Sequence, residues 1–188
     1  TSDTGAATLD TQVRDVSIMF TDIVGFTTMS EAMEPTAVAE TLNEFFGAMT
    51  DVIFEHQGTL DKFIGDAILA VFGAPFAQPD HALNAVQAAV QMRRVLGEIN
   101  QRRGGQPLNM RIAIHSGRVL TGDIGSPKRR EFTVLGDTVN TTSRLESSVA
   151  KPGSVVIGQQ TLALVEGLFD CRPLGSFSLK GKENEVLV

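Results

Sequence analysis

The sequence predicts an α+β domain in which a mixed, mostly antiparallel sheet carries its helices on one face. Strand-like apolar runs and long helical segments alternate along the chain. Several of these strands follow one another directly through glycine turns, as the strands of hairpins do. Hairpins combined with crossover helices are typical of α+β sheets and not of doubly wound parallel sheets.

The first half of the chain has the element order βαββαβ, which is that of a ferredoxin-like core. We expect a strand at about 15–22 and a helical region from about Ser30, with its apolar side chains at helical spacing. Residues 58–75 predict two short strands joined by a tight glycine–aspartate turn. A second long helix is expected from Asp80, and a further strand follows it.

The second half predicts shorter elements. Residues 108–125 are expected to form two strands around Gly117. Residues 130–148 predict a strand and then a helix. A strand, a short helix and two terminal strands, with a turn at Gly181, are expected over 153–188.

Composition narrows the class of protein. The 188 residues, 42% of them hydrophobic, suit one domain with a sizeable core. The net charge of −6 argues against a nucleic-acid-binding surface. The only cysteine is Cys171, which excludes a disulfide framework and favours a reducing compartment. No apolar run approaches the roughly 20 residues that span a bilayer, so we expect no direct membrane insertion by this segment.

We expect one domain over 13–188, preceded at 1–12 by a small, polar linker or cloning remnant. The chain stops inside an apparent strand, which favours a fragment of a larger protein. The expected location is cytoplasmic, either alone or as the cytosolic part of a membrane-attached protein.

Two carboxylates stand at strand ends. Asp22 closes the first strand, and Asp66 lies in the first hairpin turn. Neighbouring strands would bring both to one edge, where Mg²⁺ is usually held by one or two carboxylates and substrate phosphates. The backbone that follows Asp22, around Gly25, could cradle a phosphate. The alternative is two ordinary surface turn aspartates.

A second pattern lies in the helix after Gly136. Asn140 and Arg144 are four residues apart, hence on one helical face. An amide beside a guanidinium can hold a ribose oxygen and a developing phosphate charge. The alternative is a solvated helix face on which Arg144 pairs with a glutamate such as Glu146.

Five sequence blocks, in this order, resemble the catalytic domain of class III nucleotidyl cyclases: FTDIVGFT, KFIGDAILAVFG, MRIAIHSGRVLTGDIG, FTVLGDTVNTTSRLES and LKGK. The resemblance covers nearly the whole chain. It implies a class III cyclase fold that acts as a homodimer, with two composite active sites at the subunit interface and two Mg²⁺ or Mn²⁺ ions in each. Because members of this family are often joined to sensor or membrane modules, it also implies an upstream regulatory module.

The resemblance also implies a division of roles between the subunits. One subunit would supply the metal ligands Asp22, Asp66 and the Ile23 carbonyl, and the phosphate-binding groups Val24, Gly25, Phe26, Thr27 and Arg111. The other would supply the base-reading Lys62 and Thr133, the ribose-positioning Asn140, the transition-state Arg144 and the phosphate-binding Lys180. Because one chain carries both halves, a two-fold homodimer would form two equivalent sites.

The base is predicted from the motif K-x-x-G-D. Adenylyl cyclases of this family typically have Lys there, as at Lys62, whereas guanylyl cyclases typically have Glu. A buried Lys facing the N1–H and 2-amino donors of guanine would leave polar groups unpaired, at roughly 1–3 kcal/mol per group. Thr133 departs from the more usual Asp, but its hydroxyl can accept from the adenine 6-amino group. The alternative for Lys62 is a solvated strand residue.

The resulting hypothesis is an adenylyl cyclase that converts ATP to 3′,5′-cyclic AMP and pyrophosphate. Lys62 combined with Thr133 resembles a bacterial subclass, several members of which respond to bicarbonate. Two alternatives stay open, a guanylyl cyclase and a non-catalytic nucleotide-binding or dimerising domain. A diguanylate cyclase fits poorly because its GGDEF-type turn is absent.

Overall fold

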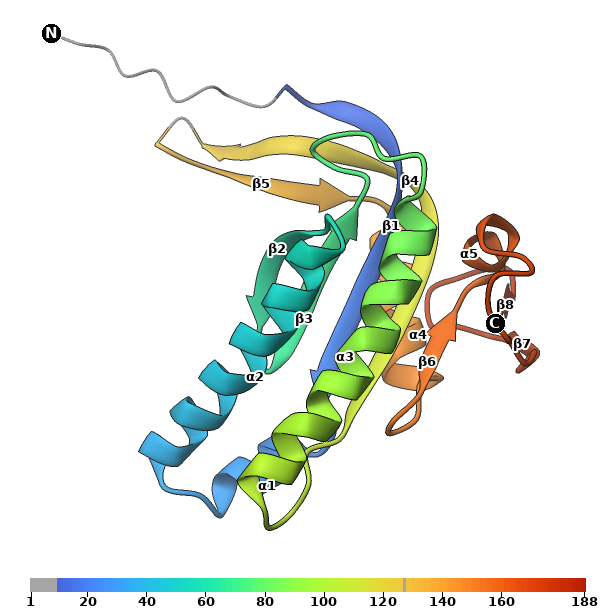
Figure 1. The fold of residues 1–188 in the computed structure, drawn as a ribbon. Helices are drawn as coiled ribbons and strands as arrows, with labels where there is room; N and C mark the ends of the chain where they lie inside the picture. The colour runs from blue at the N-terminus through green and yellow to red at the C-terminus, as the bar shows by residue number, and fades with distance from the viewer. Residues whose placement is uncertain (1–9, 127) are drawn as a thin grey trace, which may run out of the picture.

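A computed structural model describes residues 10–126 and 128–188 (Figure 1). Most of the expected linker at 1–12 lies outside these residues, and the first strand already begins at Gln12. No helix in the described part of the chain combines the length and apolarity needed to cross a membrane.

The main sheet has six strands in the order β2-β3-β1-β4-β5, with β6 pairing to β4. All pairs are antiparallel except β4 with β6. The order of β1 to β4 is that of a ferredoxin-like sheet, and the predicted α+β class is confirmed. The strands are β1 (Gln12–Ile23), β2 (Thr59–Ile64), β3 (Ala67–Phe72), β4 (Met110–Ser126), β5 (Arg129–Leu135) and β6 (Val155–Ile157).

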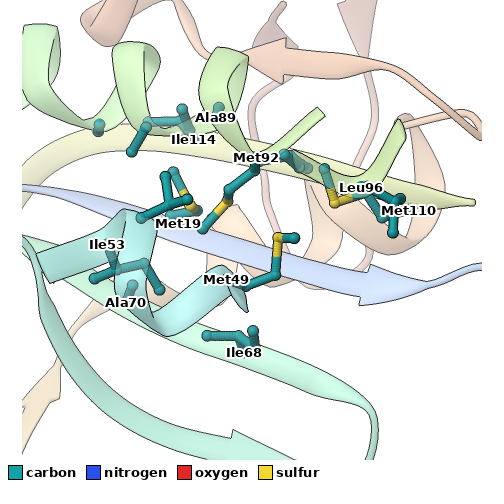
Figure 2. Close-up of a cluster of buried hydrophobic side chains, with 14 of the residues drawn as sticks. Met19, Met49, Ile53, Ile68, Ala70, Ala89, Met92, Leu96, Met110 and Ile114 are labelled. Carbon is teal, nitrogen blue, oxygen red and sulfur yellow. The ribbon is translucent and has the colours of Figure 1, made fainter. Parts of the chain in front are cut away.

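Two long helices cover one face of this sheet, and the main core lies beneath them. Strand residues that alternate along β1, β3 and β4 meet side chains of α2 and α3, as Met19 and Met92 do in Figure 2. The helices are α1 (Phe26–Glu31), α2 (Pro35–Glu55), α3 (His81–Arg103), α4 (Asp137–Ser148) and α5 (Gln159–Leu164). Burial of each large apolar side chain contributes roughly 1.5–3 kcal/mol.

Helix α4 lies on the opposite face of the sheet, whereas the sequence predicted all helices on one face. Val139 and Leu145 of α4 pack against strand residues that face away from α2 and α3, such as Ile18 and Ala113. The two-stranded sheet of β7 (Ser176–Phe177) and β8 (Val186–Leu187) lies on the same side, because Phe177 joins the Leu145 cluster. The long helices α2 and α3 therefore share one face, and α4 lies on the other.

Two element boundaries differ from the sequence prediction. The single strand β4 replaces the two strands expected around Gly117, which pairs with Val16 of β1 within an unbroken ladder. A Cβ at Gly117 would lie 2.6 Å from Thr138 Oγ1, so this glycine allows the close approach of α4 and does not mark a turn. The helical region expected from Ser30 is two helices, with Pro35 opening α2.

Candidate active site

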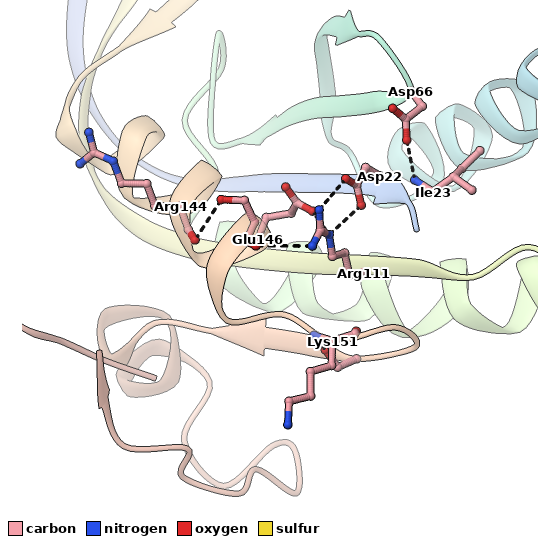
Figure 3. Close-up of polar contacts among 9 residues, drawn as sticks. Asp22, Ile23, Asp66, Arg111, Arg144, Glu146 and Lys151 are labelled. Carbon is pink, nitrogen blue, oxygen red and sulfur yellow. Dashed lines mark hydrogen bonds and ion pairs between the residues drawn. The ribbon is translucent and has the colours of Figure 1, made fainter. Parts of the chain in front are cut away.

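The two strand-end aspartates come together as predicted. Asp22 is the second-last residue of β1, and Asp66 follows Gly65 in the β2–β3 turn. The Ile23 backbone N–H donates to Asp66 Oδ2 at 3.2 Å, which holds the turn against the end of β1 (Figure 3). Burial raises the pKa of Asp66, and the negative charge of Asp22 adds to this effect.

Arg111 joins the aspartates because it lies directly opposite Asp22 in the β1–β4 ladder. Its Nε and Nη2 donate to Asp22 Oδ1 at 3.0 Å and Oδ2 at 3.1 Å. This two-pronged contact is the strong form of an arginine–carboxylate pair. Both oxygens of Asp22 are therefore engaged by one guanidinium.

Glu146 of α4 is a third carboxylate at this point. It forms an ion pair of 2.5 Å with Arg111 Nε, and its side chain is 8% exposed. Burial, together with the neighbouring Asp22, raises the pKa of Glu146 to about 7, although Arg111 acts in the opposite direction. We call Asp22, Asp66, Arg111 and Glu146 the carboxylate cluster. Three carboxylates surround one guanidinium, so the cluster has an excess of negative charge.

Sequence reasoning missed Glu146 as a site residue and offered it only as a partner for Arg144. That pairing is wrong, because Glu146 contacts Arg111 while the Arg144 side chain points away from the cluster (Figure 3). One signal was available. Glu146 follows Leu145 on the side of α4 that is buried against the sheet, where an acidic side chain needs a partner.

The donor atoms of the carboxylate cluster suit a hard divalent cation. Asp22, Asp66 and the Ile23 carbonyl offer oxygen ligands, which Mg²⁺ and Mn²⁺ prefer, and substrate phosphates commonly complete such a site. Within 10–126 and 128–188, no group of three or more His, Cys, Asp or Glu side chains has the arrangement of a ready-made metal site. A cation on Asp22 would have to compete with Arg111.

The predicted phosphate cradle is the entry to α1. Gly25 has φ +70° and stands at the N-cap, a conformation that glycine adopts readily, and Phe26 is buried. The Val24 N–H already donates to the Asn109 carbonyl at 2.7 Å. Val24 therefore has no spare N–H in the structure, whereas Gly25 to Thr27 form the start of the helix.

The two predicted base-reading residues also meet, although β2 and β5 are the two ends of the main strand order. In Figure 1, β4 curves and brings β5 towards β2. Lys62 Nζ donates to Thr133 Oγ1 at 3.4 Å and lies 3.5 Å from Asp61 Oδ2. Burial raises the pKa of Asp61, and Lys62 opposes this shift. We call Asp61, Lys62 and Thr133 the lysine cluster.

The remaining predicted residues lie on α4 and the C-terminal segment. Asn140 is exposed and Arg144 half-buried, one helical turn apart as expected. A Cβ at Gly181 would lie 3.3 Å from Arg144 Nη2, so this guanidinium packs against the chain next to the exposed Lys180. Lys182, which the sequence prediction did not use, pairs with Asp137 at the start of α4.

Comparisons with known proteins point to one family. The family model for the adenylate and guanylate cyclase catalytic domain matches residues 9–188. Adenylate cyclase 1 of Rhizobium meliloti is 37% identical over 92% of this chain, which spans 27% of that relative. The adenylyl cyclase CyaB from P. aeruginosa superposes with a TM-score of 0.91 at 32% identity, covering 95% of this chain and 94% of that one. The guanylyl cyclase Cya2 gives 0.85 at 40% identity, covering 96% and 92%.

Proposed function

The chain belongs to the adenylate and guanylate cyclase catalytic domain family, and from that premise we propose that it converts ATP to 3′,5′-cyclic AMP and pyrophosphate. The contact between Lys62 and Thr133 carries the choice of ATP. The ammonium can donate to adenine N1, and the hydroxyl can accept from the 6-amino group. Guanine would present its N1–H donor to the same ammonium, leaving polar groups unpaired at roughly 1–3 kcal/mol each.

The reaction is attack of the ribose 3′-hydroxyl on the α-phosphorus. Asp22, Asp66 and the Ile23 carbonyl would hold two Mg²⁺ or Mn²⁺ ions, which would supply activation of the hydroxyl and neutralisation of the leaving pyrophosphate. The excess of negative charge in the carboxylate cluster supports this role. With Asp22 engaged in cation binding, Arg111 would leave this aspartate and bind substrate phosphates.

The chain's other groups would orient and stabilise the substrate. Asn140 would fix the ribose, and Arg144 would donate to the α-phosphoryl oxygens as negative charge grows on them. Lys180 would share the pyrophosphate charge with Arg111. It lies two residues before Lys182, which pairs with Asp137. Gly25 to Thr27 would add backbone N–H groups at the phosphates.

The active form would be a homodimer with two composite sites. Its support is the orientation of Arg144, which points away from the carboxylate cluster of its own chain (Figure 3). A second copy related by a two-fold axis would present its own α4 to that cluster. Modules outside this chain would then regulate turnover by rotating the two halves of each site relative to each other.

The first test is turnover of ATP and GTP by the purified chain, with Mg²⁺ and then Mn²⁺, over a range of protein concentrations. We expect cyclic AMP, with a specific activity that rises as the dimer forms. Preferred formation of cyclic GMP would contradict the base assignment and favour a guanylyl cyclase, as the relative Cya2 is. No product at concentrations where light scattering detects a dimer would favour a non-catalytic nucleotide-binding domain.

We also propose activation by bicarbonate, on the basis of the Lys62–Thr133 combination. Turnover of ATP should rise when bicarbonate is added at fixed pH and ionic strength, with chloride as the matched control. Unchanged turnover would remove this chain from the bicarbonate-responsive subclass without affecting the assignment as a cyclase.

A further inference from the structure

A β-bulge shapes the lysine cluster. The pairing of β2 with β3 passes from Leu60 opposite Ala70 to Lys62 opposite Leu69, which leaves Asp61 as an extra residue without a partner on β3. Neighbouring residues of a regular strand point to opposite faces of the sheet. A bulge re-aims them, and both Asp61 and Lys62 reach Thr133.

The Asp61 side chain is fully buried, with 0% exposure, beside the partly exposed Lys62. Its Oδ2 accepts a hydrogen bond from Thr133 Oγ1 at 3.5 Å and lies 3.5 Å from Lys62 Nζ. Its Oδ1 has no hydrogen-bond partner within the described part of the chain. Burying a carboxylate is costly unless it is paired, and the pairing here is with the two base-reading residues.

These contacts fix the direction of each hydrogen bond. A threonine hydroxyl has one proton and two acceptor lone pairs. An ionised carboxylate can only accept, so the Thr133 proton points to Asp61. One lone pair of Thr133 accepts from Lys62, and only the other is left for a ligand. Lys62 keeps one of its three N–H donors after contacting Asp61 and Thr133.

We propose that Asp61 is a specificity-determining positioning residue, which turns the Thr133 hydroxyl into an obligate acceptor. Such a hydroxyl accepts from the 6-amino group of adenine and has no proton for the 6-oxo group of guanine. The inference rests on the proposed function, because it requires the base to lie against Lys62 and Thr133. It adds a residue that acts on the base through Thr133 and does not touch it.

The test is the variant Asp61→Asn, which keeps the shape of the side chain. Its amide can donate to the Thr133 oxygen, and this frees the hydroxyl proton for the guanine 6-oxo group. The measured quantity is kcat/KM for ATP divided by kcat/KM for GTP. We expect this ratio to fall about tenfold, the effect of relieving one unpaired polar group. An unchanged ratio in a folded variant would overturn the proposal.

Two controls separate hydroxyl orientation from loss of charge. Glu131 of β5 is a second carboxylate whose charge acts on Asp61, but its own partner is Arg129. The control Glu131→Gln should therefore leave the ratio unchanged. In a Thr133→Val background, Asp61→Asn should no longer shift the ratio, because no hydroxyl remains to be turned. A full shift in that background would overturn the proposal. If Asp61→Asn does not fold, Asp61→Gln, whose longer side chain also carries a donating amide, provides the same test.

A binding measurement makes the result independent of turnover. 3′-Deoxy-ATP and 3′-deoxy-GTP lack the attacking hydroxyl, so calorimetry gives their affinities without reaction. If the wild-type chain makes cyclic AMP and Asp61→Asn leaves both the turnover ratio and the binding ratio unchanged, only this inference is contradicted. A wild-type chain that prefers GTP in both assays contradicts the proposed function and the hydroxyl orientation together. If the chain is inactive, the shift in the binding ratio still decides the role of Asp61.

Discussion

The carboxylate cluster and the lysine cluster differ in how their charges are balanced. The first gathers three carboxylates around one guanidinium, so it has negative charge to spare. The second pairs one carboxylate with one ammonium beside a neutral hydroxyl. The first arrangement suits cations and the phosphates they carry, and the second suits an uncharged base. The charge count therefore separates the two halves of the proposed site.

The two clusters also depend on different features of the fold. Asp22 and Arg111 are direct partners in a ladder between neighbouring strands. Lys62 and Thr133 come from the two ends of the main strand order and meet because β4 curves, while the bulge at Asp61 aims the side chains. Register fixes the first cluster, whereas curvature fixes the second.

The largest expected effect is that of Asp22→Asn, which tests whether the excess negative charge serves catalysis. We expect kcat/KM for ATP to fall about a thousandfold, as for loss of a group that stabilises transition-state charge. The control is Asp15→Asn on the same strand, since Asp15 is 72% exposed and its contact with Arg118 is 3.6 Å long. A variant of Asp22 with near-normal activity would remove the metal assignment and the contrast between the clusters.

Arg144→Ala tests the role of an arginine that belongs to neither cluster. We expect kcat to fall about a hundredfold with little change in KM, because its contact is made mainly in the transition state. The matched control is Arg94→Ala, an exposed arginine of α3 that pairs with Glu98 one turn away. A change confined to KM would instead assign Arg144 to ground-state binding.

The sequence predicted most of the fold because local patterns determine it. Apolar periodicity, the helix start at Asp80 and the Gly65 turn are local signals, and the helices and hairpins they indicate are present. Gly117 was misjudged because its role is a contact with Thr138 of α4, and a glycine that makes room for a helix looks like a turn glycine in the sequence. The curvature of β4 had no local signal.

The clusters were predicted unevenly for the same reason. Asp22 and Asp66 follow from strand ends and a turn, and Lys62 from a motif. Glu146 and Asp61 were missed because the role of each depends on a residue that is distant in the sequence. The partner of Glu146 is Arg111 on another element, and Thr133 lies 72 residues from Asp61. Such long-range pairs cannot be read from spacing along one chain.

Arg111 and Lys62 should contribute differently to the free energy of unfolding. In metal-free protein, Arg111→Gln leaves Asp22 and Glu146 without their shared cation and should lower the free energy of unfolding by about 2 kcal/mol at pH 8. Lys62→Gln should cost less, about 1 kcal/mol, because the glutamine amide can still donate to the buried Asp61. Urea titration of both variants measures the difference.

The pH dependence of the Arg111 effect has a definite sign. Because the folded-state pKa of Glu146 is raised to about 7 from its usual 4.5, its contribution to stability is largest below pH 4.5 and is lost as the pH rises through 7. Removing Arg111 raises that pKa further. The deficit of Arg111→Gln should therefore shrink as the pH falls from 8 to 5. A deficit that grows on acidification would contradict the buried pairing of Glu146.

Mixing two inactive variants tests whether the clusters of one chain serve different active sites. Asp22→Asn disrupts the carboxylate cluster and Arg144→Ala the opposite half, so each homodimer should keep only about 1% of the wild-type activity or less. In a random mixture about half of the dimers are heterodimers, and each would contain one intact site in two. Activity should recover to about a quarter of the wild-type value. No recovery, with exchange of subunits verified by tagged chains, would place both residues in one chain's own site, because only then does each dimer carry a defect in every site.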